Sequence, residues 1–348
     1  MKILKNLFQK ISRNGKNNFI GLDIGSYSIK MVEISLSGDK PTLNGFCQAR
    51  TFETTIINQI VNDEQLLRTN LKNIFTNFQP KTHRIFLSIP YELTIFGKFS
   101  VNSPEALQEI KKQINDEIPY KLDDVYYSYF IIPEKGSYDV YYLVAKKDNI
   151  DKVQNIFKSL NYTLENIDAD FINLHNFFEF LYGQENRAII DWGHEKIKIH
   201  FSNKDVPVYT RELFNLGFKE LKNKVVKDLK VTHDMAERYL HNPPADTRGL
   251  KIKEFYKDFI KKLLEEVKFG GEIVKTKYGV WPEVFYIIGG GARIPGIHSL
   301  ISDLLKVEVR KVTINKKINI SENIDPNYLN TISTQGIMAL ATAMKALI

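Results

Sequence analysis

Aspartate, glycine and small hydroxyl residues occur together at the tip of a predicted hairpin near the start of the chain. The segment "NFIGLDIGSYSIKMVEIS", residues 18–35, contains an apolar strand that ends in Asp23-Ile24-Gly25-Ser26, and a second strand follows at once. One interpretation is an ordinary tight turn, since Asp and Gly are favoured turn residues. The other is a phosphate-binding turn, because glycine lets backbone amides approach anionic oxygens closely.

The same pattern recurs in the second half of the chain. In "RAIIDWGHEKIKIHFS", residues 187–202, an apolar strand ends in Asp191-Trp192-Gly193 and an alternating strand follows. A repeat at this long spacing predicts two related domains with similar hairpins. A third element, "VFYIIGGGARIPG" at 284–296, is a buried strand followed by a triple glycine and a helix. Each element alone is also typical of a structural turn.

Together the three elements predict a nucleotide site between two domains. Hairpins from opposite domains can hold the β- and γ-phosphates between them. The carboxylates of Asp23 and Asp191 would face a hydrated Mg²⁺, which prefers oxygen ligands and keeps several waters. The triple glycine leaves room for adenine and lets the next helix begin near the sugar and phosphate. The predicted ligands are therefore ATP and Mg²⁺.

The elements around these turns are those of an α/β protein. Hydrophobic periodicity and cap residues predict them. We expect strands over 19–24, 29–36, 46–52, 84–90, 125–133, 139–147, 187–202 as a hairpin, 207–211 and 284–289, and helices over 64–78, 104–118, 148–160, 218–229, 252–268 and 334–347.

Composition limits the class of protein. The 348 residues, 43% of them hydrophobic, suit one large or two mid-sized soluble domains. The single cysteine, Cys47, excludes an internal disulfide framework and fits a reducing cytoplasm. No apolar run reaches the roughly 18 residues of a membrane span. The net charge of +7 comes from well-mixed charges, so we expect no nucleic-acid partner.

The first 18 residues contain five basic residues and no acid, with apolar residues at helical spacing. They fit either an amphipathic helix on an anionic membrane or a solvated arm.

The chain resembles the actin, sugar-kinase and heat-shock chaperone ATPases, and more narrowly the PilM family of type IV pilus assembly proteins, from Phe19 to Leu347. Beside the turns, the resemblance rests on "EIPYKLDDVYYSYFII", "YLVAKKDNIDKVQNIFKSLNYTLENIDADFINL", "PVYTRELFNLGFKEL" and "VFYIIGGGARIPGIHSLISDLLKVEV". The first two look like the extra subdomain of PilM and its relative FtsA. The resemblance implies an α/β, actin-like (ribonuclease H-like), two-lobed duplicated fold with an FtsA/PilM-type α+β insert.

The implied divisions are a basic segment at 1–18, a first actin-like domain at 19–100, an inserted subdomain at 101–165, a return to the first domain at 166–186, a second actin-like domain at 187–333, and a C-terminal helix at 334–348 that packs back on the first domain.

The resemblance also implies roles for individual residues. The first phosphate loop is matched by Asp23, Gly25, Ser26 and Ser28 with Lys30 at its edge, the second by Asp191 and Gly193, the adenosine loop by Gly289, Gly290, Gly291 and Pro295, and the second inter-domain crossover by Gly336. Asp170 falls where relatives usually have a glutamate that orients the attacking water. Asp170 and Asp191 are therefore the candidate catalytic residues.

Three departures from the family pattern bear on hydrolysis. Trp192 and His194 are bulky where relatives have small residues, so we expect them to crowd a phosphate. Asp170 is one methylene shorter than glutamate, and "FNLGF" at 214–218 has a single glycine. We therefore expect slow or absent hydrolysis, with ATP retained as a ligand that stabilises the folded state.

The implied function is that of a nucleotide-binding scaffold in type IV pilus assembly and twitching motility, cytoplasmic and peripheral to the inner membrane. Its partner would be the cytoplasmic N-terminal tail of the inner-membrane protein PilN, held in a groove between the first domain and the insert. Other pilus inner-membrane and motor components, and homo-oligomerisation, are further implied contacts. The alternatives are an FtsA-like polymerising membrane tether, a sugar or acid kinase of the same superfamily, and a GspL-type secretion component.

Overall fold

The first hairpin of the chain lies in the centre of a mixed β-sheet. A computed structural model describes residues 18–37 and 40–347, so the predicted basic segment falls outside the described residues except for Asn18. Strands β1 (Asn18–Ile24), β2 (Ser28–Ser37) and β3 (Lys40–Arg50) are antiparallel neighbours. Strands β6 (Arg84–Ile89) and β10 (Thr163–Ala169) add parallel to β1, which gives the order β10-β6-β1-β2-β3-β16, with β16 at Asn319–Ile320.

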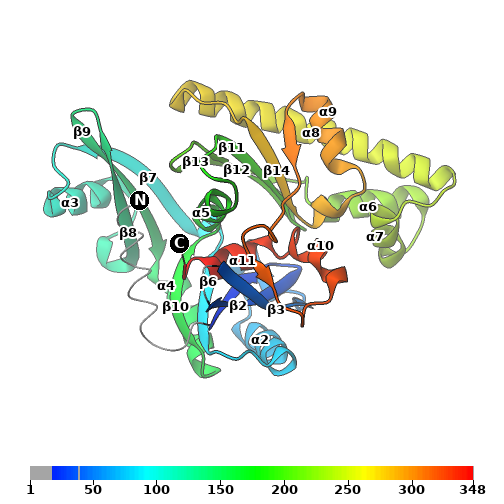
Figure 1. The fold of residues 1–348 in the computed structure, drawn as a ribbon, viewed down its shortest axis with the longest axis horizontal. Coiled ribbons are helices and arrows are strands. Elements are labelled where there is room, and N and C mark those ends of the chain that lie inside the picture. The colour runs from blue at the N-terminus through cyan, green and yellow to red at the C-terminus, as the bar shows by residue number, and fades with distance from the viewer. Residues whose placement is uncertain (1–17, 38–39, 348) are drawn as a thin grey trace.

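Both faces of this sheet are covered, which explains why β1 reads as a continuous apolar run. Helices α2 (Glu64–Phe78) and α4 (Lys147–Ser159) pack on one face, and α5 (Asp170–Tyr182) and α11 (Ile337–Met344) pack on the other (Figure 1). Helix α11 approaches so closely that a Cβ on Gly21 would lie 2.1 Å from the carbonyl oxygen of Ala339. Only glycine therefore fits at this point of β1.

The second sheet repeats the arrangement of the first. Strands β11 (Arg187–Trp192), β12 (Lys196–Ser202) and β13 (Pro207–Phe214) are antiparallel, and β14 (Val284–Gly289) and β15 (Glu308–Arg310) add parallel to β11. The order is β13-β12-β11-β14-β15. Helices α6 (Phe218–Leu229), α7 (His233–His241), α8 (Thr247–Tyr278) and α9 (Ile297–Leu305) belong to this second lobe. The predicted internal duplication is confirmed in the strand order of the two sheets.

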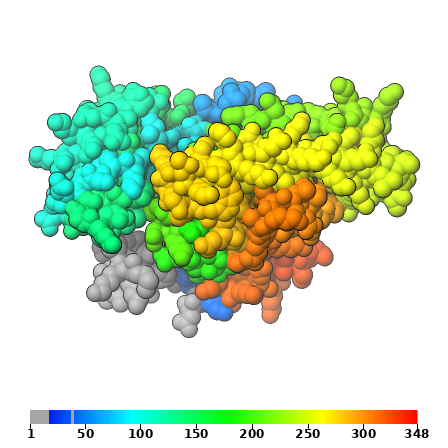
Figure 2. All heavy atoms as spheres, turned by 90° about the horizontal axis from the view of Figure 1, so that it is seen from above, coloured from blue at the N-terminus to red at the C-terminus, as the bar shows by residue number. Residues whose placement is uncertain are grey.

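An inserted subdomain lies at one end of the molecule (Figures 1 and 2). Its sheet has the order β7-β9-β8, with β7 at Thr94–Val101, β8 at Val125–Glu134 and β9 at Ser137–Lys146. Helix α3 (Leu107–Glu117) packs on it through Ile110 and Ile114, which belong to a small core of its own. Because β7 is part of this sheet, the subdomain begins earlier along the chain than the change of composition near residue 101.

The remaining elements are short. They are β4 (Ile56–Ile57), β5 (Ile60–Val61), α10 (Leu329–Ile332) and the 3₁₀ helices η1 (Tyr91–Leu93), η2 (Leu122–Asp124), η3 (Gly290–Arg293) and η4 (Pro326–Tyr328). Among the helices that the structure describes, none is long and apolar enough to cross a membrane.

The predicted and observed boundaries of an element agree best where a side chain caps a helix. Helix α2 starts at the predicted residue, because the Asp63 carboxylate accepts a hydrogen bond from the amide of Leu66 at 2.9 Å. The predicted start of the next helix at Pro104 is wrong. The Ser103 hydroxyl instead accepts a local bond from the Glu105 amide, and α3 begins only at Leu107. The third strand begins at Lys40 rather than residue 46, and α8 is longer than its apolar stripe.

Candidate functional site

The two hairpin tips face one cavity between the lobes, which we call the interlobe cavity. It has a volume of about 150 Å³. Residues from both lobes and from the crossover helix α5 line it. Of the predicted site residues, its wall contains Asp23, Gly25, Ser26, Ser28, Lys30, Asp170, Asp191, Gly193, Gly289 and Gly290. The structure thus brings together the two hairpin tips and two of the three adjacent glycines, from three segments that lie far apart in the sequence.

Three predicted residues do not belong to the described wall of this cavity: Gly291, Pro295 and Gly336. Gly291 has a packing function instead, because a Cβ there would lie 2.1 Å from Cδ2 of Trp192. Gly336 similarly approaches the Phe46 ring, at 2.9 Å for an added Cβ. Close packing against Trp192 and Phe46 therefore accounts for the glycines at 291 and 336.

The two hairpins place a lysine at the same register position. Asp23 is the cross-strand partner of Lys30, and Asp191 is the cross-strand partner of Lys198. The Lys30 ammonium pairs with its own hairpin's Asp23 at 3.0 Å. The Lys198 ammonium instead pairs with Asp170 at 2.6 Å and with Glu92 at 2.9 Å. The equivalent lysines thus have different partners.

Lys198 belongs to a buried network that joins three parts of the chain. Lys196, two residues earlier on the same face of β12, contacts Glu92 and pairs with Glu212 of β13 at 2.7 Å. Glu92 comes from η1, between the first lobe and the insert, and Asp170 is the first residue of α5. Such buried pairs are costly to break, because a lone charge would remain away from water.

The two aspartates near the second hairpin have opposite electrostatic environments. Burial raises the pKa of Asp191 to about 6; Asp23 and Asp170 add to this, while Lys198 and Lys30 oppose it. Burial also acts to raise the pKa of Asp170, but the charges of Lys198 and His200 and two hydrogen bonds lower it below its ordinary value. Asp191 makes no side-chain ion pair within the described residues, whereas Asp170 has a tight one.

The donor set fits a hydrated cation better than a directly bound one. No group of three or more His, Cys, Asp or Glu residues in the described chain could hold a metal ion. Asp23 and Asp191 nevertheless face the cavity from opposite lobes, and Asp191 is a half-buried carboxylate that interacts with the charges of Asp23 and Asp170. A Mg²⁺ that keeps its waters and phosphate ligands is compatible with two such carboxylates.

An aromatic contact joins the hairpin tips across the cavity. The rings of Tyr27 and His194 have centroids 4.0 Å apart, and the Tyr27 hydroxyl donates to Glu237 of α7 at 2.8 Å. Arg50 lies 3.6 Å above the Tyr27 ring. Burial, with nearby Lys222, lowers the pKa of His194 to about 3, so this ring is neutral at physiological pH. The contact therefore links the lobes without an ion pair between the rings.

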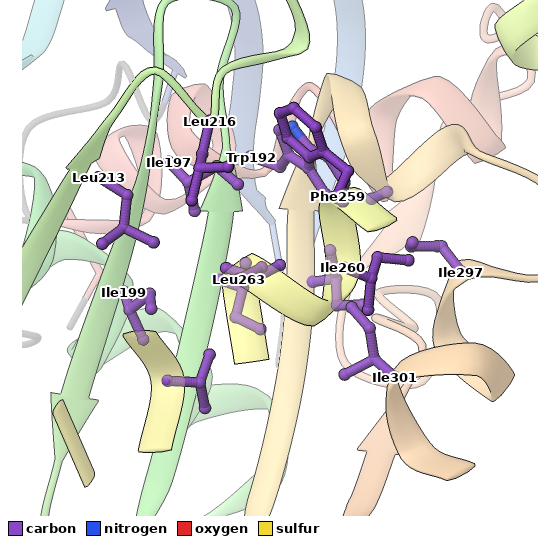
Figure 3. Packing of buried hydrophobic residues seen from close by; sticks show 14 of the residues in the cluster. Trp192, Ile197, Ile199, Leu213, Leu216, Phe259, Ile260, Leu263, Ile297 and Ile301 are labelled. Carbon is purple, nitrogen blue, oxygen red and sulfur yellow. The ribbon is translucent and has the colours of Figure 1, made fainter. Parts of the chain in front are cut away.

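The expectation that Trp192 crowds a phosphate is wrong. Its side chain is fully buried on the opposite side of the sheet from the cavity and stacks on Phe259 with ring centroids 5.7 Å apart (Figure 3). The glycine at 291 provides the space for the indole. His194 does line the cavity, as does Gly193 beside it.

Several wall residues were not predicted from the sequence. The most notable are Lys196, Lys198, Glu237, His241 and Gln335, which line the cavity. Glu92, which is not part of the described wall, contacts two of these lysines and was not predicted either. The alternation in "EKIKIH" places Lys196 and Lys198 on one face of their strand, which was a usable signal. No sequence signal pointed to Glu92 or Glu237, because tertiary packing alone brings Glu92 to the lysines and Glu237 to the cavity.

A second concave surface, which we call the insert groove, lies between the first lobe and the insert. It measures about 360 Å³ and is lined by β8, β9, α4 and β10. Both β8 and β10 are edge strands of their sheets. Ile89, at the end of β6, lines this groove and the interlobe cavity as well. One residue thus forms part of both walls.

Comparisons with known proteins agree on family and fold. The family model for the type IV pilus assembly protein PilM matches residues 21–347. The chain is similar to a solved structure described as the PilM-PilN type IV pilus biogenesis complex, with TM-score 0.79, 19% identity and coverage of 94% of this chain and 98% of that chain. No curated protein matches the sequence.

Two further structures share the fold. The ethanolamine utilization protein EutJ from Carboxydothermus hydrogenoformans has TM-score 0.54, 13% identity and coverage of 98% and 96%. An MreB of Spiroplasma citri bound to AMPPNP has TM-score 0.51, 12% identity and coverage of 85% and 92%. The predicted actin-like fold is confirmed, and the chain belongs to the PilM family of type IV pilus assembly proteins.

Proposed function

We propose that this PilM-family chain is an ATP-binding adaptor that captures the cytoplasmic tail of a PilN-type inner-membrane protein. The observation that carries the proposal is the convergence of both hairpins, Asp170 and the Gly289-Gly290 turn on one cavity. A nucleotide analogue is bound in the similar MreB structure. The adaptor would work at the cytoplasmic face of the inner membrane, where further pilus components are its natural neighbours.

The proposed ATP site assigns roles to the residues of the interlobe cavity. The backbone of the tips at 24–28 and 193–196 would face the phosphates, with Lys30 as a nearby cation. Asp23 and Asp191 would hold Mg²⁺ through its waters, and the ion would neutralise phosphate charge. The Gly289-Gly290 turn, which leads into η3, would lie beside the nucleoside. In this proposal the two lobes are the two actin-like domains, and the insert comprises β7, α3, β8 and β9.

The insert groove has the features of a site for an extended peptide. Tyr126, Tyr127 and Ser128 of edge strand β8 form one side, and residues 164–167 of edge strand β10 form the other. Edge strands present unpaired backbone groups, which an added strand can satisfy. Tyr126 is 46% exposed, so an apolar side chain is already available to a partner. A peptide tail from an inner-membrane protein would attach the adaptor to the membrane.

The shared wall supports a dependence of peptide capture on nucleotide. Ser88, Ile89 and Pro90 line the interlobe cavity and also a small second cavity, whose wall includes residues of β4, β5 and α4. The next residues, η1 and β7, lead directly into the insert. A change in this segment on nucleotide binding would therefore act on both sites.

The first test is calorimetric titration with ATP and ADP, with and without Mg²⁺. We expect binding to the unaltered protein, at least about tenfold weaker binding to Asp23→Ala, and no change for Asp303→Ala, an exposed aspartate of α9. Absence of binding to folded protein would contradict the ATP site.

The second test measures binding of a synthetic PilN-type tail peptide to ATP-loaded protein. Gln154→Trp would place a large side chain in the insert groove, whereas Asn155→Trp changes an exposed neighbour that does not line it. We expect only the first variant to lose peptide binding. Equal binding by both variants would place the peptide elsewhere.

A further inference from the structure

We infer that Lys198 is a positioning residue that holds Asp170 in an ion pair and thereby keeps bound ATP from being hydrolysed. The inference rests on the proposed ATP site and adds a regulatory role for one residue of its wall. Lys198 lines the interlobe cavity, yet its ammonium is directed to two carboxylates outside its own hairpin.

The register of the two hairpins makes the pairing unexpected. Lys30 and Lys198 are both cross-strand partners of their hairpin's aspartate. Lys30 keeps that partner at 3.0 Å. Lys198 leaves Asp191 without an ion pair among the described residues and binds Asp170 at 2.6 Å. The strand pairing is the same in both hairpins, so it does not explain why the two lysines have different partners. The pairing of Lys198 follows instead from the positions of Asp170 and Glu92.

Both oxygens of Asp170 are engaged. Oδ1 accepts from the backbone amide of Phe171 at 2.7 Å, and Oδ2 accepts from the Lys198 ammonium at 2.6 Å. Asp170 is 4% exposed and Lys198 is 8% exposed. Because both groups are buried, the pair is poorly screened by water, and separating it would leave the Asp170 carboxylate without its counter-charge.

Lys198 is also held from its other side. Glu92 forms an ion pair with it at 2.9 Å and contacts Lys196 as well. Glu92 belongs to the first lobe, whereas Lys198 belongs to the second. The lysine is thus fixed by carboxylates from two parts of the chain, which keeps it from swinging away from Asp170.

ATP hydrolysis requires a group that orients water and receives its proton. The water oxygen bonds to the γ-phosphorus, the bond from that phosphorus to the β–γ bridging oxygen breaks, and ADP departs with the electron pair. The water's protons pass to a base and to the products. A carboxylate neutralised by a neighbouring ammonium is a weaker base and has less freedom to orient a water. Asp170 in its present pair is therefore poorly suited to the task.

The test is phosphate release in a single turnover at saturating ATP, which separates the rate from affinity. We expect Lys198→Met to raise the rate at least about threefold, a small part of the range for general-base catalysis. Lys198→Arg, which keeps the charge, should retain the slow rate. Lys224→Met is the control, because it removes a lysine of α6 that pairs with Asp228 and does not line the interlobe cavity.

A pH profile distinguishes positioning from a general loosening of the site. Without Lys198, Asp170 becomes protonated at higher pH, so the acid-side fall of the rate should shift upward in Lys198→Met but not in Lys224→Met. An unchanged or lower rate in Lys198→Met, or an equal rise in both variants, would overturn the inference. Rapid hydrolysis by the unaltered protein would overturn it while leaving ATP binding intact, and absence of ATP binding would overturn the proposed site and this inference together.

Discussion

The hairpins β1–β2 and β11–β12 have the same strand pairing but differ in how their side chains are supported. In the first, Asp23-Ile24-Gly25 leads to a lysine paired within the hairpin. In the second, Asp191-Trp192-Gly193 leads to a lysine paired outside it, and the middle residue is a fully buried tryptophan. The two hairpins therefore have the same strand pairing, but only the second packs a tryptophan into the core and pairs with α5 through Asp170.

The largest difference is expected between the two middle residues. Trp192 is fully buried and stacks on Phe259, whereas Ile24 is half-buried at the cavity. Trp192→Ala should lower the free energy of unfolding by about 3–5 kcal/mol, and Ile24→Ala by about 1–2 kcal/mol, because only the first leaves a large internal void. Urea unfolding measures both, and equal losses would remove this distinction between the hairpins.

The next difference concerns acid stability. His200 in β12 occupies the position of Val32 in β2, two residues after the equivalent lysines. Burial lowers the pKa of His200 to about 4, and Lys198 also lowers it, while Asp170 and Glu212 oppose this. Because the unfolded state, with a pKa near 6.5, binds the proton first, stability falls as pH drops from about 6.5 towards 4.

Replacing this histidine by the first hairpin's residue should remove its share of the acid loss. When the pH falls from about 7.5 to about 5, the free energy of unfolding of the unaltered protein should decrease by about 2 kcal/mol more than that of His200→Val. Other buried histidines, such as His175 with a pKa of about 4, remain in both proteins and cancel in the comparison. Urea unfolding at several pH values measures this, and parallel curves of unfolding free energy against pH would show that His200 does not contribute to the acid loss of stability.

A smaller effect is expected where the hairpins touch. Tyr27 and His194 have ring centroids 4.0 Å apart, so Tyr27→Ala and His194→Ala should not be additive. A double-mutant cycle on the free energy of unfolding should give a coupling of about 1 kcal/mol. Tyr27→Ala combined with Tyr328→Ala, an exposed and distant position, serves as the additive control. Additive effects of Tyr27→Ala and His194→Ala would mean that the contact between the two rings does not stabilise the fold.

The smallest difference is expected at the glycines of the two tips. A Cβ on Gly25 would lie 3.0 Å from the Ser28 carbonyl oxygen, and one on Gly193 would lie 2.9 Å from that of Lys196. Gly25→Ala and Gly193→Ala should each cost about 1 kcal/mol, and the two costs should agree within about 0.5 kcal/mol. Thermal unfolding would check this, and a clear inequality would show that the turns are not equivalent.

Sequence patterns predicted the hairpins because turn residues and alternating strands are local signals. Asp23, Gly25, Asp191 and Gly193 lie in the predicted hairpins and line one cavity, and the two sheets repeat the same strand order. The direction of Trp192 was not predictable in this way. It depends on space left by Gly291, which is distant in sequence and close only in the folded sheet.

The partners of the site lysines were equally beyond local patterns. Strand alternation places Lys198 towards the cavity, but its pairing with Asp170 spans 28 residues and follows from how α5 begins at the end of β10. The contact of Glu92 with β12 depends on the approach of the two lobes. The ion-pair partners in such a network depend on how the elements are arranged in space, and hydrophobic periodicity does not predict that arrangement.

The position of α11 has a consequence for biosynthesis. This helix is buried along its whole length and covers one face of the first sheet at Gly21. While a ribosome is still translating the second lobe, residues 337–344 do not yet exist, and the apolar face of β1 lacks its cover. The first lobe therefore cannot finish folding as it emerges, although it is made first. Both lobes should reach the native state in one late step, which makes the nascent chain a natural client for chaperones.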